Sequence, residues 1–540
     1  GDVYKRQDIK INCRIAARKH QIPVLMEASD RATIDIERFD LEPSRPILHG
    51  YIEHLDISKV KGLKTNEEKL PYILPIVGID TMSTRLKASA VEVGQTINTW
   101  PQLASAVTLG GGITTDVCRR ILLDQLHQSG RYFVDIEELI GDPHKEEHVF
   151  ELPEIEPLTN SKMAQMASLV TLNHIEAHTE SDKTVIESLV KGALTAPSAG
   201  NMQPWKWYFD GNALFLFHDE ERTVSFGDFR NMVSNLSLGT AVEHILLRAS
   251  QMKLKTDHVL FPLGHDHKNN LVAAFRFYKD NTVEEDLLAE YFGYRHTNRN
   301  HGKGIKIKSD IFDDLKQSVT PVKGARLRVI EDEALLKKAA YIAGKADKLR
   351  IFIEDAHFDM FNRELRFSED ALENVKEGLD MRTLSLKPKD QVGFQVIKDI
   401  KAIRLINEWN GGEALEATSR ELVESSAAAG IITMPSFNPE HVLNAGRATE
   451  RVWLTATSHG VAFQPMLASV IHFARIMYGN GEGIPDKISK EFMQLHEEFS
   501  ELFGIKGTTE VPLFLFRLCY AEPPQLLAQR LDIESVYYSK

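Results

Sequence analysis

Ten residues, APSAGNMQPW at 196–205, combine a helix stop with two side-chain amides and a tryptophan. Asn201 and Gln203 each carry hydrogen-bond donors and an acceptor, which suits the imide edge of a heterocycle. Pro197 and Pro204 restrict the backbone and hold the loop stiff. A second interpretation stays open, in which the stretch is a proline-punctuated turn that anchors its tryptophan in the core.

A second stretch, YRHTNRNHGKG at 294–304, carries groups that bind phosphate. Arg295, Thr297 and Arg299 present two guanidinium groups and a hydroxyl just past a glycine. Guanidinium groups bind phosphate oxygens through paired, charge-assisted hydrogen bonds. Taken alone, this stretch is also compatible with a solvated basic loop.

Together the two stretches resemble the nitroreductase-like flavoproteins, which bind FMN on an α+β fold at a dimer interface. In that family an R-x-S/T-x-R/K motif holds the flavin phosphate and ring, and a P-S-S-x-N-x-Q-P-W loop reaches the flavin from the other half of the dimer. The first motif matches Arg295, Thr297 and Arg299. The loop matches Pro197, Ser198, Asn201, Gln203, Pro204 and Trp205, while Ala199 replaces the second serine.

The two motifs occur in the reverse of the usual family order. This order resembles a branch of the family in which two nitroreductase-like halves lie in one chain, here 161–290 and 291–540. The first half has the loop without the arginine motif, and the second half has the arginine motif without the loop. The resemblance therefore implies one composite site and one FMN per chain.

Two further segments of the second half resemble the family. SHGVAFQPML at 458–467 resembles the loop that faces flavin N5, which places Gln464, Pro465 and Met466 near the reacting edge. YAEPPQLLAQR at 520–530 resembles the C-terminal tail that brings a basic residue, here Arg530, to the phosphate. The alternatives are the end of a core helix and a surface tail.

The first part of the chain, 8–140, resembles the C-terminal part of a ThiF or E1-like adenylating domain through INCRIAARKHQIPVLMEASDR and a later Gly-rich helix. The Gly-rich ATP loop of such domains is absent here, and GIDTMSTR at 78–85 has no cysteine. The opening GDVYKRQ resembles a translated sequencing adapter, so we expect the natural protein to start upstream. An acidic, proline-containing linker is expected at 141–160.

Hydrophobic periodicity predicts the helices that position these residues. A capping box of Thr184 and Glu187 begins one of them, Thr282 and Glu285 begin another that ends at Gly293, and Gly460 ends a third. The remaining predicted helices cover 11–20, 99–126 and 229–252, and those named above cover 184–196 and 448–459.

Apolar runs predict the strands. IPVLMEAS at 22–29 is typical of a strand buried on both faces of a parallel sheet. Residues 205–209 and 213–218 predict a hairpin, and 511–521 a late buried strand. The expected fold class is thus an α/β remnant of an E1-like, Rossmann-type domain, followed by an α+β nitroreductase-like fold duplicated within one chain.

Composition excludes several classes of protein. The net charge of -13 argues against general binding to nucleic acid or membranes, and no run reaches the about 18 apolar residues of a membrane span. Three cysteines, Cys13, Cys118 and Cys519, form no C-x-x-C pair, which favours a reducing cytoplasm. Cys13 and Cys118 lie on predicted helices and are expected to be buried. His265 and His267 do not complete a metal site, so no metal is expected.

These observations predict a cytoplasmic FMN-dependent oxidoreductase that passes electrons from NAD(P)H to a small acceptor such as a quinone or nitro compound. The flavin would carry the chemistry, with no side-chain nucleophile. One alternative is a flavin-binding or flavin-storing protein without turnover. Another is an E1-like adenylating protein of cofactor biosynthesis whose active N-terminus is missing here. A homodimer through the E1-like part is a further expectation.

Overall fold

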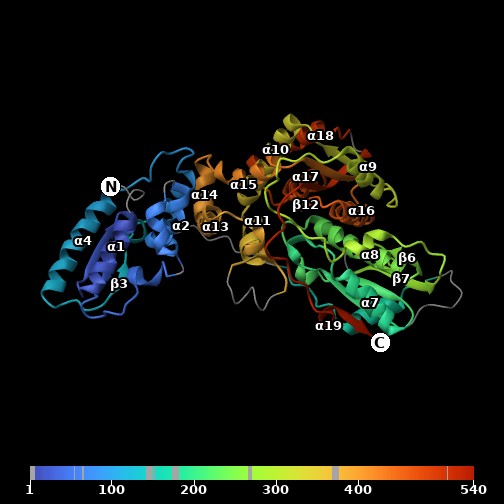
Figure 1. Cartoon of the computed structure of the whole chain (residues 1–540), viewed down its shortest axis with the longest axis horizontal. Helices are drawn as coiled ribbons and strands as arrows, with labels where there is room; N and C mark the ends of the chain where they lie inside the picture. Colours follow the sequence, from blue (N-terminus) through green and yellow to red (C-terminus); the bar gives the residue numbers. More distant parts are fainter. Residues whose placement is uncertain are drawn as a thin grey trace. The chain divides into compact units, whose positions relative to one another are not determined.

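The computed structural model divides the chain into two compact units (Figure 1). It describes residues 7–53, 55–63, 66–141, 150, 153–172, 182–265, 270–367, 376–506 and 509–540. The first unit comprises Gly1–Val149 and Leu386–Ala414, and the second comprises Phe150–Ser385 and Leu415–Lys540. Half of the predicted linker, 142–149 and 151–152, lies outside the described residues. Across the described ranges, no helix is both long and apolar enough to cross a membrane.

The sheet of the first unit is antiparallel. β1 (Val24–Ala28), β2 (Thr33–Glu37) and β3 (Gly130–Tyr132) follow one another in the sheet, and both pairings are antiparallel. The chain turns straight back after β1 through Asp30–Ala32, which leaves no room for the crossover helix that a parallel pair requires. The prediction of a parallel sheet at 22–29 is therefore wrong, and β1 is only half-buried.

Two helices from late in the sequence belong to the first unit. Val396 of α13 packs in one core with Leu74, Met82 and Leu86, so 386–414 departs from the predicted second half. The helices of this unit are α1 (Gln7–Lys19), α2 (Asn66–Val77), α3 (Thr84–Glu92), α4 (Ala104–Leu122), α5 (Ile136–Leu139), α13 (Pro388–Ile397) and α14 (Ile400–Glu408).

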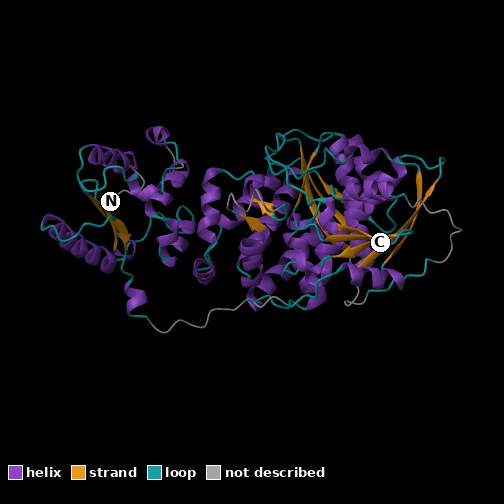
Figure 2. Cartoon of the chain, turned by 90° about the horizontal axis from the view of Figure 1, so that it is seen from below, coloured by secondary structure: helices purple, strands orange, loops and turns teal. Residues whose placement is uncertain are grey.

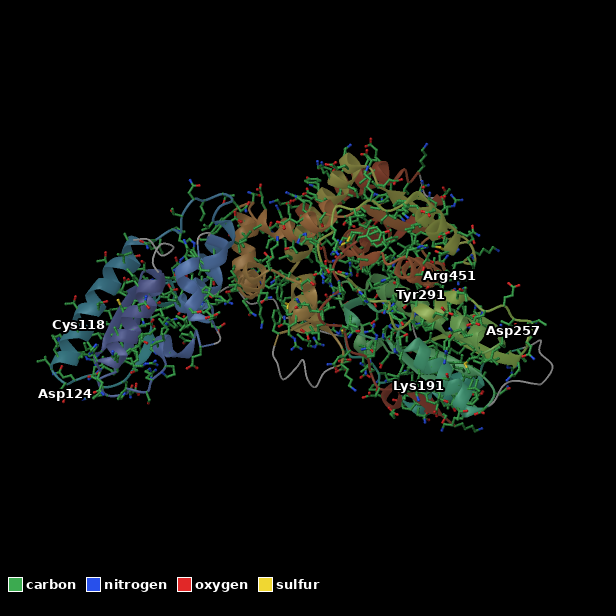
Figure 3. All side chains as sticks on the ribbon, in the orientation of Figure 1. Cys118, Asp124, Lys191, Asp257, Tyr291 and Arg451 are labelled. Carbon is green, nitrogen blue, oxygen red and sulfur yellow. The ribbon has the colours of Figure 1, made fainter. Side chains whose placement is uncertain are left out.

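The cysteines of the first unit are not buried. Cys118 on α4 (Figure 3) and Cys13 on α1 are both exposed. Helix α4 buries only Gly110 and Val117, because it packs through a narrow face. The expectation of buried cysteines is wrong at both positions.

The first half of the second unit is built on a hairpin. The predicted hairpin is confirmed, since β4 (Trp205–Phe209) and β5 (Leu214–His218) pair antiparallel. The predicted capping box at Thr184 is wrong, because Asp182 is the residue whose side chain accepts the hydrogen bond at the N-terminus of α7. The other elements are α6 (Asn160–Ser168), α7 (Lys183–Ala193), α8 (Met232–Gln251), β6 (Leu254–Leu260) and β7 (Leu271–Lys279).

The second half repeats this arrangement of strands. Its sheet has the order β8-β11-β13-β12, and the first sheet has the order β4-β5-β7-β6, with every one of these pairs antiparallel. In each half one long helix connects two strands along the chain. Helix α8 joins β5 to β6, and α16 joins β11 to β12. The elements are α9 (Ser309–Ser318), β8 (Arg326–Ile330), β11 (Ala428–Met434), α16 (Pro439–Ser458), β12 (Ala462–Pro465), α17 (Ala468–Gly479), α18 (Asp486–Phe503) and β13 (Val511–Cys519).

The halves differ most between their first two strands. A short turn joins β4 to β5, whereas 331–427 separate β8 from β11. This long segment carries α13 and α14 into the first unit. It also holds α10 (Glu333–Ile351), α11 (Glu354–Asp359), β9 (Leu365–Arg366), β10 (Leu379–Asp380) and α15 (Ala414–Glu424).

Helices α8 and α16 pack closely and reciprocally. A Cβ atom on Gly239 of α8 would overlap the Leu443 carbonyl of α16, and one on Gly446 would overlap the Leu236 carbonyl of α8. Arg451 of α16 (Figure 3) also donates to Glu243 of α8 at 2.8 Å. The two halves of the second unit therefore form one packed body, with helices around both sheets (Figure 2).

The C-terminal tail crosses from the second half to the first. β14 (Tyr537–Ser539) adds to the first sheet beside β4, after the short helix α19 (Ile533–Val536). The helix predicted before Gly293 is instead a 3-10 turn, Leu287–Tyr291, capped by Asp286. The predictions of helices at 229–252 and 448–459 and of a strand at 511–521 are confirmed.

Candidate functional site

One cavity of about 550 Å³ in the second unit collects residues from both halves. The loop after α7 contributes from the first half. The segment before α9, the end of β12 and the C-terminal tail contribute from the second half. Of the predicted site residues, those lining the cavity are Pro197, Ser198, Asn201, Arg295, Thr297, Arg299, Gln464, Met466 and Arg530.

The first-half loop places Asn201 at the cavity wall in a left-handed backbone conformation. The loop makes a 3-10 turn over Ala199–Asn201, and Asn201 has a φ of 54°. Asparagine tolerates this conformation better than most residues. Trp205 follows and is fully buried in the core, so the loop is also the tryptophan anchor proposed as its alternative role.

The amide of Asn201 connects separate segments of the chain. Its Nδ2 donates to the carbonyls of Gln529 at 3.1 Å and Lys376 at 3.3 Å, and its Oδ1 accepts from Arg530 Nη1 at 2.9 Å. In this structure Asn201 therefore positions the Arg530 guanidinium rather than presenting a free amide to the cavity.

Gln203 is absent from the cavity lining. Its side chain is fully buried, its Nε2 donates to the Lys376 carbonyl at 2.8 Å, and its Oε1 accepts from Leu531 N at 2.8 Å. A buried amide with both ends bonded to backbone has a structural role here. The expected contact of Gln203 with the edge of a ligand ring is thus not available from this geometry.

Arg295 lies deep in the cavity wall. Its Nη2 donates to the Thr195 carbonyl at 3.0 Å, its Nε lies 3.3 Å from Glu450 Oε1, and its guanidinium sits 4.7 Å from the Trp453 ring centre. Burial lowers the pKa of Arg295, while the charge of Glu450 opposes the shift. Contacts from the loop after α7 and from α16 therefore fix the direction of this guanidinium.

Glu450 and His244 were not predicted from the sequence. Glu450 of α16 is fully buried, and its Oε1 lies 2.7 Å from His244 Nε2 of α8. The His244 ring also stacks on Phe292. Histidine and glutamate are uncommon on the buried face of a long helix. A helical projection of the sequence could therefore have identified both positions.

Arg299 and Arg530 are cations without carboxylate partners among the residues the structure describes. Arg299 Nη1 donates to the Thr383 carbonyl at 3.2 Å, and Arg530 Nε has no hydrogen-bond partner in the described ranges. Burial, aided by Arg517, lowers the pKa of Arg299 to about 10. Burial, aided by Arg295, lowers the pKa of Arg530 to about 9. A bound anion would relieve this uncompensated positive charge.

Thr297, Gln464 and Met466 complete the lining. Thr297 forms an isolated bridge with Phe463, which ties the arginine loop to β12. Gln464 Oε1 accepts from Arg517 Nε at 2.6 Å, and Met466 N donates to the Leu515 carbonyl at 2.8 Å. The latter two groups are therefore engaged within the protein.

The described part of the chain holds no group of three or more His, Cys, Asp or Glu residues placed to bind a metal ion. His265 is described, whereas His267 lies outside the described residues.

Sequence comparison finds relatives over the whole chain and over part of it. The chain is 29% identical over 531 residues to an uncharacterized protein, MT1398, of Mycobacterium tuberculosis (strain CDC 1551 / Oshkosh), covering 97% of this chain and 70% of that protein. Part of this chain is also similar to a sequence named as a nitroreductase. A protein of the same organism named "Putative NAD(P)H nitroreductase acg" is 27% identical over 180 residues, or 33% of this chain and 53% of that protein.

Solved structures give weaker similarity, and no family model matches the chain. An FMN-bound nitroreductase from Bacteroides fragilis aligns over 46% of this chain and 95% of its own, with 9% identity and a TM-score of 0.25. The FMN- and NADPH-dependent nitroreductase NfnB from sphigopyxis sp. strain HMH gives 11% identity and a TM-score of 0.28 over 46% and 96% of the two chains. TM-scores of this size do not establish a common fold. No comparison supports the E1-like interpretation of 8–140.

Proposed function

We propose that the second unit is an FMN-dependent oxidoreductase that accepts electrons from NAD(P)H and passes them to a small organic acceptor, such as a quinone or nitro compound. The observation that carries the proposal is the convergence of Arg295, Arg299 and Arg530 with the Asn201 loop on one cavity. The sequence relative named as a nitroreductase supports the same class of activity.

The residues present fit an anionic cofactor. Arg299 and Arg530 lack carboxylate partners among the described residues, and the Nε of Arg530 is buried and unbonded. A phosphate would supply acceptors for these donors and lower the electrostatic cost of their burial. Glu450 alone, facing Arg295, does not balance three arginines.

The flavin and the residues around the cavity would each have a distinct role in this function. FMN, when bound, supplies the two-electron chemistry. Arg299 and Arg530 would hold the phosphate, and Arg295 would hold negative charge deeper in the cavity. Thr297 would add a hydroxyl, Ser198 would border the ring, and Asn201 would act by fixing Arg530.

We also infer that the second unit is a pseudo-dimer. The equal strand orders of its halves and the reciprocal approach of α8 and α16 support an internal duplication. The tail that pairs with β4 gives the first half a strand from the second half. In such an arrangement one chain builds the site that two subunits build elsewhere.

The absorption spectrum of the purified protein tests the proposal. A bound flavin absorbs in the visible range, and released FMN can be counted against protein. Oxidation of NADPH with a quinone or nitroaromatic then separates an oxidoreductase from a protein that only stores flavin. A colourless protein that takes up no added FMN would exclude both functions.

A further inference from the structure

Two buried polar groups in the same cavity have no hydrogen-bond partner among the described residues. Ser469 and His472 lie one turn apart at the start of α17, and both line the cavity. They are 1% and 2% exposed, and neither Ser469 Oγ nor His472 Nε2 has a hydrogen-bond partner within the described part of the chain. Burying such groups without a hydrogen bond is unfavourable, so the arrangement favours a ligand that satisfies both.

The hydrogen-bond direction of His472 is fixed by its surroundings. Its Nδ1 lies 2.7 Å from the Ala468 carbonyl, which can only accept, so Nδ1 carries the proton. Burial lowers the pKa of His472 to about 3, which keeps the ring neutral. Nε2 is therefore an acceptor, whereas the Ser469 hydroxyl can donate.

Charges of both signs surround His472. Arg350 and Arg475 lower the pKa of its ring further, and a carboxylate is also near, since the Phe226 N–H donates to Asp359 Oδ2 and the Phe226 ring lies 6.3 Å from the His472 ring. Burial raises the pKa of Asp359 to about 6. The cavity lining as a whole includes the carboxylates of Asp228, Asp347, Asp359 and Glu364 and the guanidinium groups of Arg350 and Arg363.

This part of the cavity contrasts with the arginine cluster. Arg350 already pairs with Glu364 at 2.8 Å, and Arg363 lies 3.6 Å from Asp359. An anionic ligand would place its lone pairs against the acceptor Nε2 of His472, so a neutral ligand with a hydrogen-bond donor fits better. The donor of Ser469 beside the acceptor of His472 matches the C=O and N–H₂ of a primary amide.

We propose that Ser469 and His472 form a subsite for the primary carboxamide of an aromatic or heteroaromatic ligand that exchanges electrons at this site. The inference rests on the proposed function, because it deepens the specificity of the same cavity. An amide-bearing acceptor and a nicotinamide nucleotide share this chemistry, and matched probes distinguish them.

Calorimetric titration of FMN-loaded protein with two probe pairs tests the subsite. The first pair is 4-nitrobenzamide and N,N-dimethyl-4-nitrobenzamide, which differ in the amide N–H groups. The second pair is NADP⁺ and its 3-acetylpyridine analogue, in which a methyl ketone replaces the amide. We expect the primary amide to bind about three- to tenfold more tightly in at least one pair, and that pair identifies the source of the amide.

His472→Phe should erase this preference while keeping the stacking on Phe492 and the FMN content. Ser469→Ala is a smaller change that should also reduce the preference. It replaces His472→Phe as the test if that variant does not fold. His258→Phe is the matched control, because His258 also stacks on a phenylalanine but lies outside the cavity lining. Equal affinities within both pairs, or a preference that survives both substitutions, would overturn the subsite. Absence of FMN binding would instead count against the proposed function.

Discussion

The two halves of the second unit share a strand order but differ in what they place around the cavity. After α7, the first half has a loop with Ser198 and Asn201, whereas the equivalent connection after α9, VTPVKGA at 319–325, has no side-chain amide. After β12, the second half has α17, whereas β6 and β7 of the first half are joined by a short connection. The same framework thus carries different side chains at related positions.

This difference shows that two halves with the same strand order can carry different side chains around one cavity. The paired sheets and the α8–α16 crossing depend on apolar packing, on close backbone approach and on buried polar pairs such as Arg451 with Glu243. The cavity also depends on particular polar and charged side chains. At each pair of related positions, only one half supplies them. We therefore expect substitutions at related positions of the two halves to have unequal effects on FMN binding.

The largest expected effect is that of Arg295→Ala. A charge-assisted hydrogen bond to phosphate or another anion contributes about 1.5–3 kcal/mol, so FMN should bind roughly tenfold to a hundredfold more weakly. Fluorescence titration with FMN measures this, and Arg326→Ala, at an exposed arginine outside the cavity lining, is the control.

Arg295→Ala also leaves Glu450 with less compensation, so thermal stability should fall. The double variant Arg295→Ala, Glu450→Gln should recover stability, while FMN should still bind several-fold more weakly than to the parent protein. Recovery of both would mean that Arg295 acts only through folding.

Arg530→Ala should weaken FMN binding by about tenfold, a smaller effect because this side chain comes from the tail. Arg530 has no carboxylate partner within the described residues, so its removal leaves no buried carboxylate without an ion-pair partner. Melting temperature should stay close to that of the parent protein. A large loss of stability with unchanged FMN affinity would show that Arg530 is structural.

Glu450→Gln should strengthen FMN binding a few-fold and raise the reduction potential of the bound flavin. The reason is that a buried negative charge beside Arg295 and within reach of Arg530 is removed. Equilibrium dye titration gives the potential. A potential that falls would contradict the assignment of Glu450 as the counter-charge of this cluster.

The smallest expected effect is that of Lys323→Ala in the connection after α9. FMN content and affinity should not change, because this segment is outside the cavity lining. A loss comparable to that of Arg530→Ala would remove the proposed inequality between the halves.

Local sequence predicted the loop and the arginine motif because their residue types and spacing are themselves the signal. The hairpin at 205–218 and the strand ending at Cys519 were also predictable, since turn residues and apolar runs are local features. Nine of the ten proposed site residues line one cavity, and the exception, Gln203, is bonded to backbone of the tail.

The remaining features depend on contacts between distant segments. His244 meets Glu450 only because α8 crosses α16, and no pattern within either helix specifies that crossing. Likewise, the apolar residues of 388–408 predict helices without indicating that α2 and α3 cover them. The direction of β2 relative to β1 followed from a tight turn at Asp30–Ala32 whose geometry the apolar run does not encode.

The flavin content of the purified chain tests the composite site most directly. We predict one equivalent of FMN per chain, strongly reduced in the second-half variant Arg295→Ala and reduced to about the level of Arg530→Ala in the first-half variant Asn201→Leu, which frees Arg530. Two equivalents per chain, or full retention of FMN in either variant, would contradict a single site built from both halves.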